Sequence, residues 1–255
     1  MPYATVNGVR LYYEEHGSGE PILCIHGTSS SAMIWGPALG ELAPLGRVIT
    51  HDRRGCTRSE RPEPYVTNVA QHGEDAAALL EALGAAPAVV IGRSYGGETA
   101  LSLALRHPGA VRALVLLEAA VLSFDPEALR WAEESRDLLL PVAAQAPESV
   151  GRAFIERVAG PAAWASFPEP IRQMITDNGP AILAEFEGGF LDADVQDLAR
   201  IDVPTLLVAA SDSPPAFRRV TERMAAAIPG ARVELVGGGH LVSLRNQPCW
   251  PSCAS

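Results

Sequence analysis

The chain has 255 residues, 47% of them apolar and 20% charged, which is the composition of a globular domain with a sizeable core. Its formal net charge of −10 argues against nucleic acid or an anionic membrane as a partner. All 20 basic residues are arginine, so the sequence excludes a Schiff-base lysine and a lysine-containing phosphate loop.

The N-terminus shows no charged and then apolar leader, and no stretch approaches the roughly 20 apolar residues that span a bilayer. These two features predict a cytoplasmic protein that does not interact with a membrane. At the other end, Pro248 and Pro251 make a long final helix implausible.

The first predicted elements are a hairpin that turns at Asn7-Gly8 and an apolar strand at 21–25. The second of these runs directly into His26-Gly27-Thr28. A His-Gly pair lets the backbone turn sharply and aims the amide of Thr28 inward. We expect the ring of His26 to hold this loop by hydrogen bonds and to take no part in chemistry.

The most informative motif is Gly92-Arg93-Ser94-Tyr95-Gly96, which lies between a predicted strand at 88–91 and a predicted helix at 97–106. A serine at such a junction sits on a sharp, strained turn with its hydroxyl presented outward. The spacing therefore predicts Ser94 as a nucleophile. The amides of Tyr95 and Thr28 are predicted to form a two-donor oxyanion hole.

Two carboxylates follow predicted strands. Glu118 ends the apolar strand at 111–117, and Asp212 follows the strand at 204–209. Ligands bind at the carboxyl ends of parallel strands, so either side chain is placed to orient a histidine.

Strand signals vanish between these two strands, and amphipathic helical stretches separated by prolines replace them. We predict an inserted helical cap over 121–200, with residues 1–120 and 201–255 forming the core domain. The large apolar side chains of the cap either pack it on the core or line a pocket; they are Phe124, Trp131, Phe154, Trp164, Phe167, Met174, Phe186 and Phe190.

His240 follows the last predicted strand, at 232–236, and three glycines. A serine hydroxyl needs a base to take its proton, and imidazole is the side chain best matched to neutral pH. We therefore predict His240 as that base. The other histidines are assigned structural or surface places: His51 is expected to be structural, and His16, His72 and His107 are expected at the surface.

With these pieces assembled, the chain resembles the α/β-hydrolase superfamily over nearly its whole length. The resemblance implies a mostly parallel sheet flanked by helices, with an inserted helical cap, and the order nucleophile, acid, histidine. It is carried by Gly8 in the opening hairpin, His26-Gly27-Thr28, Asp52-Arg53-Arg54-Gly55, Gly92-Arg93-Ser94-Tyr95-Gly96, His107-Pro108, Asp202-Val203-Pro204 and Gly239-His240.

The resemblance implies a serine hydrolase that acts on a small, fairly apolar carboxylic ester or lactone through an acyl-enzyme, without metal or cofactor. Serine at position 94 argues against the superfamily members that use aspartate there, which are dehalogenases and epoxide hydrolases. The alternatives are a carbon–carbon bond hydrolase, a cofactor-free haloperoxidase-like enzyme, or a non-catalytic ligand-binding protein on the same fold.

Position alone does not choose between Glu118 and Asp212 as the acid. The superfamily's commoner arrangement favours Asp212, but the usual Gly-x-x-Asp is absent there and Asp212 is also placed to cap the helix predicted at 215–228. We favour Glu118, because a glutamate that closes an apolar strand needs a partner. Asp212 remains the alternative.

Overall fold

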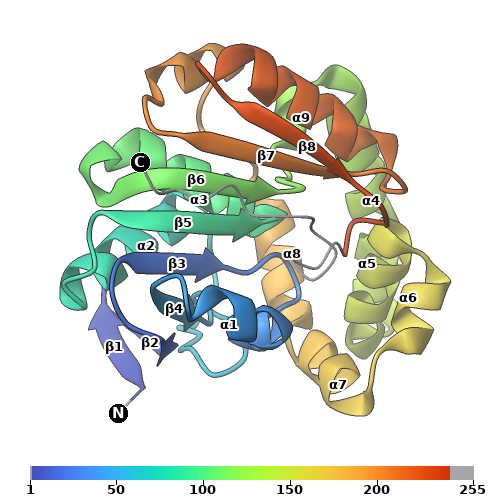
Figure 1. The fold of residues 1–255 in the computed structure, drawn as a ribbon. Coiled ribbons are helices and arrows are strands. Elements are labelled where there is room, and N and C mark those ends of the chain that lie inside the picture. Colours follow the sequence, from blue (N-terminus) through green and yellow to red (C-terminus); the bar gives the residue numbers. More distant parts are fainter. Residues whose placement is uncertain (1, 242–255) are drawn as a thin grey trace.

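A twisted sheet of eight strands forms the centre of the protein (Figure 1). The computed structural model describes residues 2–241. The strand order is β1-β2-β4-β3-β5-β6-β7-β8, with antiparallel pairing of β2 to β1 and to β4 and parallel pairing elsewhere. The strands are β1 (Tyr3–Val6), β2 (Val9–His16), β3 (Pro21–Ile25), β4 (Arg47–His51), β5 (Ala88–Arg93), β6 (Val111–Leu117), β7 (Thr205–Ala210) and β8 (Arg232–Val236).

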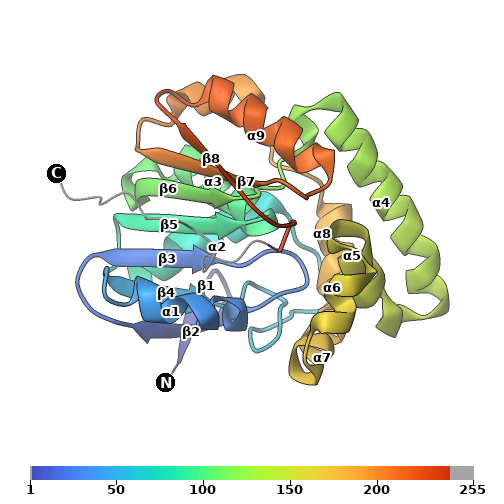
Figure 2. The ribbon, with the colours of Figure 1, turned by 45° about the vertical axis from the view of Figure 1, so that its right-hand side comes forward.

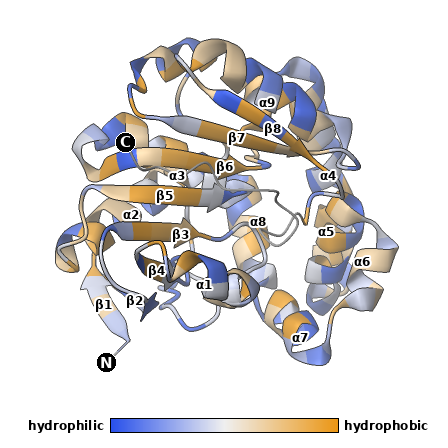
Figure 3. Cartoon of the chain, in the orientation of Figure 1, coloured by the Kyte–Doolittle hydropathy of each residue, from blue (hydrophilic) through white to orange (hydrophobic). Residues whose placement is uncertain are grey.

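The central parallel strands are apolar on both faces (Figure 3). Along β5, Val90 packs into the cluster formed with α2 (Val69–Ala82), α3 (Tyr95–Arg106) and α9 (Pro215–Ala227), whereas Ile91 packs into the cluster formed with α1 (Gly36–Leu42). Successive side chains of a strand point to opposite faces, so continuous apolar runs are needed where helices cover both sides.

The chain between β6 and β7 contains helices and, among its described residues, no strand. These inserted helices lie beyond the carboxyl ends of the parallel strands, as Figures 1 and 2 show. They are α4 (Pro126–Gln145), α5 (Val150–Ala159), α6 (Pro161–Ser166), α7 (Glu169–Asp177) and α8 (Gly179–Gly188). Short 3-10 helices complete the chain: η1 (Ala32–Trp35), η2 (Pro108–Ala110), η3 (Leu122–Phe124), η4 (Pro147–Ser149) and η5 (Val195–Arg200).

One expectation about the histidines is wrong. His72 is buried on α2, where its ring lies within hydrogen-bond distance of Thr67 and Arg53. The polar neighbours of His72 in the sequence suggest a surface, but the buried Arg53 of another segment supplies a polar partner inside. Pro248 and Pro251 lie outside the described residues. Among the helices of residues 2–241, none combines the length and hydropathy that crossing a bilayer requires.

Candidate active site

Ser94 occupies a strained turn between β5 and α3. Its φ of +53° lies in the left-handed region, which a residue with a side chain rarely adopts. A β-carbon on Gly96 would lie 2.2 Å from the carbonyl oxygen of Ile25, so only glycine fits where the turn meets β3. The strand and helix thus fix the serine in a conformation that its own backbone preference disfavours.

Three side chains from separate parts of the chain form a hydrogen-bonded series. The Ser94 hydroxyl is 2.9 Å from Nε2 of His240, and Nδ1 of His240 is 3.2 Å from Oε2 of Glu118. All three residues are buried. The structure therefore brings together the two residues predicted for nucleophile and base, and it places Glu118 on the far side of the ring.

Glu118 is held in place from several sides. Its Oε1 accepts a hydrogen bond from the amide of Ala210 at 2.7 Å, and its Oε2 accepts one from the hydroxyl of Ser213. Its own φ is +50°, a second left-handed residue at this edge of the sheet. These donors compensate a carboxylate that has no exposure to solvent.

Asp212, the alternative acid, is exposed, and its carboxylate accepts a hydrogen bond from the neighbouring Ser211 at 2.8 Å. It does not reach His240. It does not cap α9 either, because the residue at that N-terminus is Pro214 and no side chain caps it.

The ring of His240 stacks on Phe217 of α9, with 3.9 Å between ring centroids. Arg93 donates a hydrogen bond to the backbone carbonyl of His240 at 3.3 Å. Burial lowers the pKa of His240 below its usual 6.5, although the Glu118 carboxylate opposes this shift. The imidazole is therefore neutral at physiological pH and able to accept a proton.

The loop after β3 lies against the serine. A β-carbon on Gly27 would come within 3.0 Å of the β-carbon of Ser94. Within residues 2–241, neither the amide of Thr28 nor that of Tyr95 has a hydrogen-bond partner. Two free amides at this site can hold the negative oxygen of a tetrahedral intermediate.

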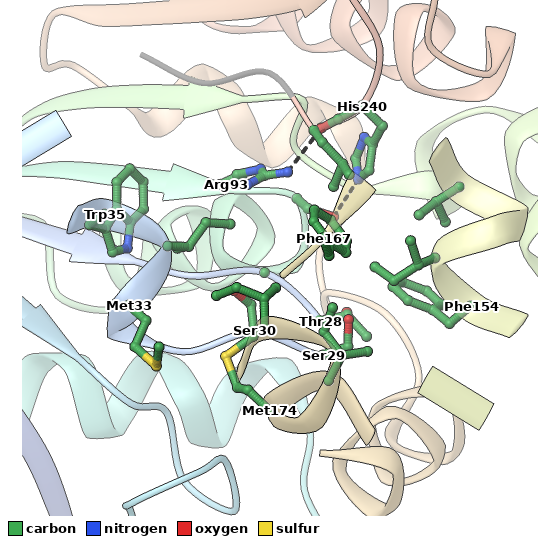
Figure 4. Close-up of a pocket in the computed structure, with 18 of the residues that line it drawn as sticks. Thr28, Ser29, Ser30, Met33, Trp35, Arg93, Phe154, Phe167, Met174 and His240 are labelled. Atoms are coloured by element: carbon green, nitrogen blue, oxygen red, sulfur yellow. Dashed lines mark hydrogen bonds between the residues drawn. The ribbon is translucent and has the colours of Figure 1, made fainter. Parts of the chain in front are cut away.

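Two cavities open onto Ser94 and His240. The larger has a volume of about 270 Å³ and a mainly apolar surface, although Arg93 and several hydroxyl side chains also line it, and the smaller has a volume of about 70 Å³. Figure 4 shows Phe154, Phe167 and Met174 of the inserted segment around the same cavity as Thr28 and His240 of the core. The site can therefore hold a molecule with a larger apolar part and a smaller second part.

Six of the eight large apolar side chains singled out between 121 and 200 line these cavities. Phe154 lines both. Phe167 and Met174 line the large one, and Trp131, Phe186 and Phe190 the small one. Phe124 and Trp164 line neither: Phe124 is buried in the main core cluster, and Trp164 is half-buried against the cluster of the inserted helices.

Sequence reasoning missed several residues that hold the site. Phe217, Ser213 and the buried Glu185 of α8 carry no motif, and only the three-dimensional contacts reveal them. Within the described part of the chain, no three side chains of His, Cys, Asp or Glu come together as a potential metal-binding group.

The geometry, an oriented serine at a strand-to-helix turn of a mostly parallel sheet, is that of a hydrolase of the α/β class, and comparison with known proteins agrees. Residues 20–247 match the model of the alpha/beta hydrolase fold family, so the chain belongs to this family.

Three relatives illustrate the range of the family. The chain is 34% identical over 254 residues to the Azorhizobium caulinodans protein named "Putative carbamate hydrolase RutD", covering 95% of this chain and 92% of that one. It is 38% identical over 120 residues to 2-hydroxymuconate semialdehyde hydrolase of Pseudomonas sp. strain CF600, covering 46% and 42%. The structure of a thermophilic esterase from Thermogutta terrifontis superposes with a TM-score of 0.75 at 28% identity, covering 94% and 90%.

Proposed function

We propose that the protein is a serine hydrolase that cleaves a small, fairly apolar carboxylic ester or lactone through an acyl-enzyme. The observation that carries this proposal is the hydrogen-bonded series Ser94, His240 and Glu118 at the junction of two mainly apolar cavities. The inserted helices act as a cap that closes the site, and the partner is a small molecule.

The proposed reaction has two halves. Oγ of Ser94 attacks the carbonyl carbon while Nε2 of His240 takes the hydroxyl proton, and the carbonyl oxygen becomes an oxyanion at the amides of Thr28 and Tyr95. When the intermediate collapses, His240 returns the proton to the leaving alkoxide, and the acyl group remains on Ser94.

In the second half, His240 deprotonates a water molecule that attacks the acyl-enzyme, and Ser94 leaves with the proton from His240. The Glu118 carboxylate accepts a hydrogen bond from Nδ1–H of His240, which fixes the tautomer with a lone pair on Nε2, and its charge stabilises the imidazolium.

The cavities support a substrate with few charged groups. The large cavity accepts the more apolar part of the ester, since its lining offers hydrocarbon and thioether surface. The names of the relatives, a carbamate hydrolase and an esterase, fit acyl chemistry at a carbonyl flanked by a heteroatom.

The second candidate is a carbon–carbon bond hydrolase, which the partial similarity to 2-hydroxymuconate semialdehyde hydrolase favours. A cofactor-free haloperoxidase-like activity would use the same three residues. A non-catalytic ligand-binding protein is disfavoured, because it has no need of a serine held in a strained turn.

The test is hydrolysis of p-nitrophenyl esters of increasing acyl length, a set of lactones, a carbamate and a vinylogous 1,5-diketone by the parent protein and by Ser94→Ala. We expect turnover of one ester or lactone class, and a loss on the order of 10⁶ in kcat for Ser94→Ala with an unchanged melting temperature. A kcat of Ser94→Ala that lies within about tenfold of the parent value contradicts the proposal. Turnover of the diketone alone supports the second candidate.

A further inference from the structure

A fully buried ion pair lies beneath the proposed oxyanion hole. Arg53 follows β4, and its Nη2 is 2.6 Å from Oε1 of Glu185 on α8 of the inserted helices. Their side chains are only 1% and 3% exposed. Charges this deeply buried are costly unless every donor and acceptor is used, so the remaining contacts show what the pair holds.

Arg53 binds the loop that carries Thr28. Its Nε donates to the carbonyl of His26 at 3.0 Å, and its Nη2 donates to the carbonyl of Gly27 at 3.0 Å. The ring of His26 accepts a hydrogen bond from the Arg53 amide through Nε2 and donates to the same Gly27 carbonyl through Nδ1, at 2.9 and 2.8 Å. Both carbonyls before Thr28 are thus fixed by one side chain.

A peptide group is planar, so fixing the direction of its carbonyl also fixes the direction of its N–H. The bond between Gly27 and Thr28 is trans, so its N–H points opposite to its carbonyl. Two donors pulling on the Gly27 oxygen turn the Thr28 N–H away from Arg53 and make it a stronger donor, because hydrogen bonds in a chain polarise one another.

Glu185 contacts the side chain of Thr28. Its Oε2 accepts a hydrogen bond from the Thr28 hydroxyl at 2.6 Å. The guanidinium of Arg53 also lies over the ring of Tyr95, 4.7 Å from its centroid. The pair therefore contacts the residues that supply both free amides.

We propose that Arg53 and Glu185 are positioning residues for the oxyanion hole, which orient and polarise the Thr28 amide and couple it to the inserted helix α8. This inference rests on the proposed function. It adds that a helix of the inserted segment, besides lining the cavities, sets the strength of transition-state stabilisation in the core.

The positive charge of Arg53 suits this positioning role. Burial alone would lower the pKa of Arg53, but the adjacent Glu185 carboxylate raises it above its ordinary value. The guanidinium is consequently charged at every pH of interest, and its effect on the Gly27 carbonyl does not vary with the state of His240.

The experiment compares Glu185→Gln, which removes the charge that pairs with Arg53, and Thr28→Val, which removes the hydroxyl that donates to Glu185, with the parent. Three quantities are measured: kcat and KM for the best ester, the inhibition constant of an alkyl trifluoromethyl ketone, and that of the matching methyl ketone. The fluorinated ketone adds to the serine and forms an oxyanion, whereas the methyl ketone fills the cavity without forming a stable adduct.

For both variants we expect kcat/KM to fall about 10- to 100-fold, mainly through kcat, with the trifluoromethyl ketone weakened by the same factor. Binding of the methyl ketone should weaken much less than that of the trifluoromethyl ketone, and Thr28→Ser, which keeps the hydroxyl, should bind the trifluoromethyl ketone more tightly than Thr28→Val does. Should Glu185→Gln fail to fold, Thr28→Val gives the answer alone.

The matched control is Asp75→Asn. Asp75 forms a similar buried ion pair with Arg54, the residue after Arg53, and 2.7 Å separates Nη2 of Arg54 from Oδ1 of Asp75. Among the described residues, Asp75 makes no hydrogen bond to the loop of Thr28 and instead accepts one from Asn7. We expect Asp75→Asn to lower the melting temperature and leave the binding of both ketones unchanged.

The inference is wrong if Glu185→Gln or Thr28→Val folds and binds the trifluoromethyl ketone as tightly as the parent does. It is also wrong if Asp75→Asn weakens that ketone equally, since the effect would then be one of general stability. Neither result touches the proposed function, which fails instead if the parent hydrolyses no ester or lactone.

Discussion

His240 experiences two opposing effects. Burial and the charge of the nearby Arg93 disfavour its charged form, and Glu118 favours that form. The net shift is downward from 6.5, which keeps the base neutral over a wider range of pH than a free imidazole.

This shift determines the pH dependence that we predict. Only neutral His240 accepts the proton of Ser94, so kcat/KM should fall as the pH drops through the histidine pKa, with its midpoint below 6.5. A pH profile of kcat/KM for a neutral ester tests this. A midpoint above the reference value of about 6.5 is inconsistent with a buried neutral base.

The choice of acid gives a second prediction at this scale. Glu118→Gln should lose roughly 10³–10⁴ in kcat, because the amide no longer selects the productive tautomer of His240. Asp212→Asn, a matched loss of one carboxylate, should retain the parent kcat, because Asp212 is exposed and, among residues 2–241, its carboxylate hydrogen-bonds to Ser211 and not to His240. Steady-state kinetics of the two variants decide the matter, and the reverse pattern would show that Asp212 is the acid.

The sequence predicts these residues unevenly, for physical reasons. Ser94 is marked by local rules, since the glycines around it are required by the turn itself. The acid is not marked locally, because Glu118 and Asp212 both follow strands, and three-dimensional contacts, above all that between Glu118 and His240, separate them. The catalytic roles themselves stay predictions until the variants are measured.

At the scale of secondary-structure elements, a buried acid lies where α3 contacts the segment after α8. Glu98 is 1% exposed and accepts a hydrogen bond from the amide of Leu191 at 2.7 Å. Burial raises the pKa of Glu98 from 4.5 to about 8. The folded state thus binds a proton that the unfolded chain releases above pH 4.5.

Stability should therefore decrease as the pH rises between 4.5 and about 8, because the folded state must either hold the proton or bury a charge. In Glu98→Gln this loss should vanish, since a neutral amide occupies the place of the protonated acid. We expect the free energy of unfolding of the parent to lose up to about 1.4 kcal/mol per pH unit relative to the variant. Urea titrations at pH 5 and 8 measure it, and an equal difference at both values contradicts the prediction.

The strands are the elements that the sequence predicts best, because an apolar run of five to seven residues can be buried on both faces only in a covered sheet. The helical nature of 121–200 also follows from local pattern. Contacts between these helices and the core do not, because partners such as Arg53 and Glu185 lie 132 residues apart in the sequence. The wrong placement of His72 has the same origin.

At the scale of the whole molecule, the two unequal cavities define a size preference. Phe167→Ala should enlarge the large cavity and shift the preferred chain length upward, with kcat/KM for the next longer esters rising by about tenfold relative to the short ones. Trp164→Ala is the control, because Trp164 lies close by on α6 but lines neither cavity. Two ester series, one varying the acyl chain and one the alcohol, identify which part occupies the large cavity. An equal shift in the control, or none in either series, contradicts this prediction.

Glu118 stands directly before the inserted helices, and the amide of Ala120 donates to the carbonyl of Ser94 at 3.1 Å. The insertion therefore begins at a fixed point of the site, while Ser94, Glu118 and His240 all lie outside it. For recombination between relatives this means that residues 121–200 can be exchanged as one cassette without removing any of the three. The cassette must bring its own equivalent of Glu185, so chimeras that keep a carboxylate at that position should inherit a new substrate range, and those without it a weakened enzyme.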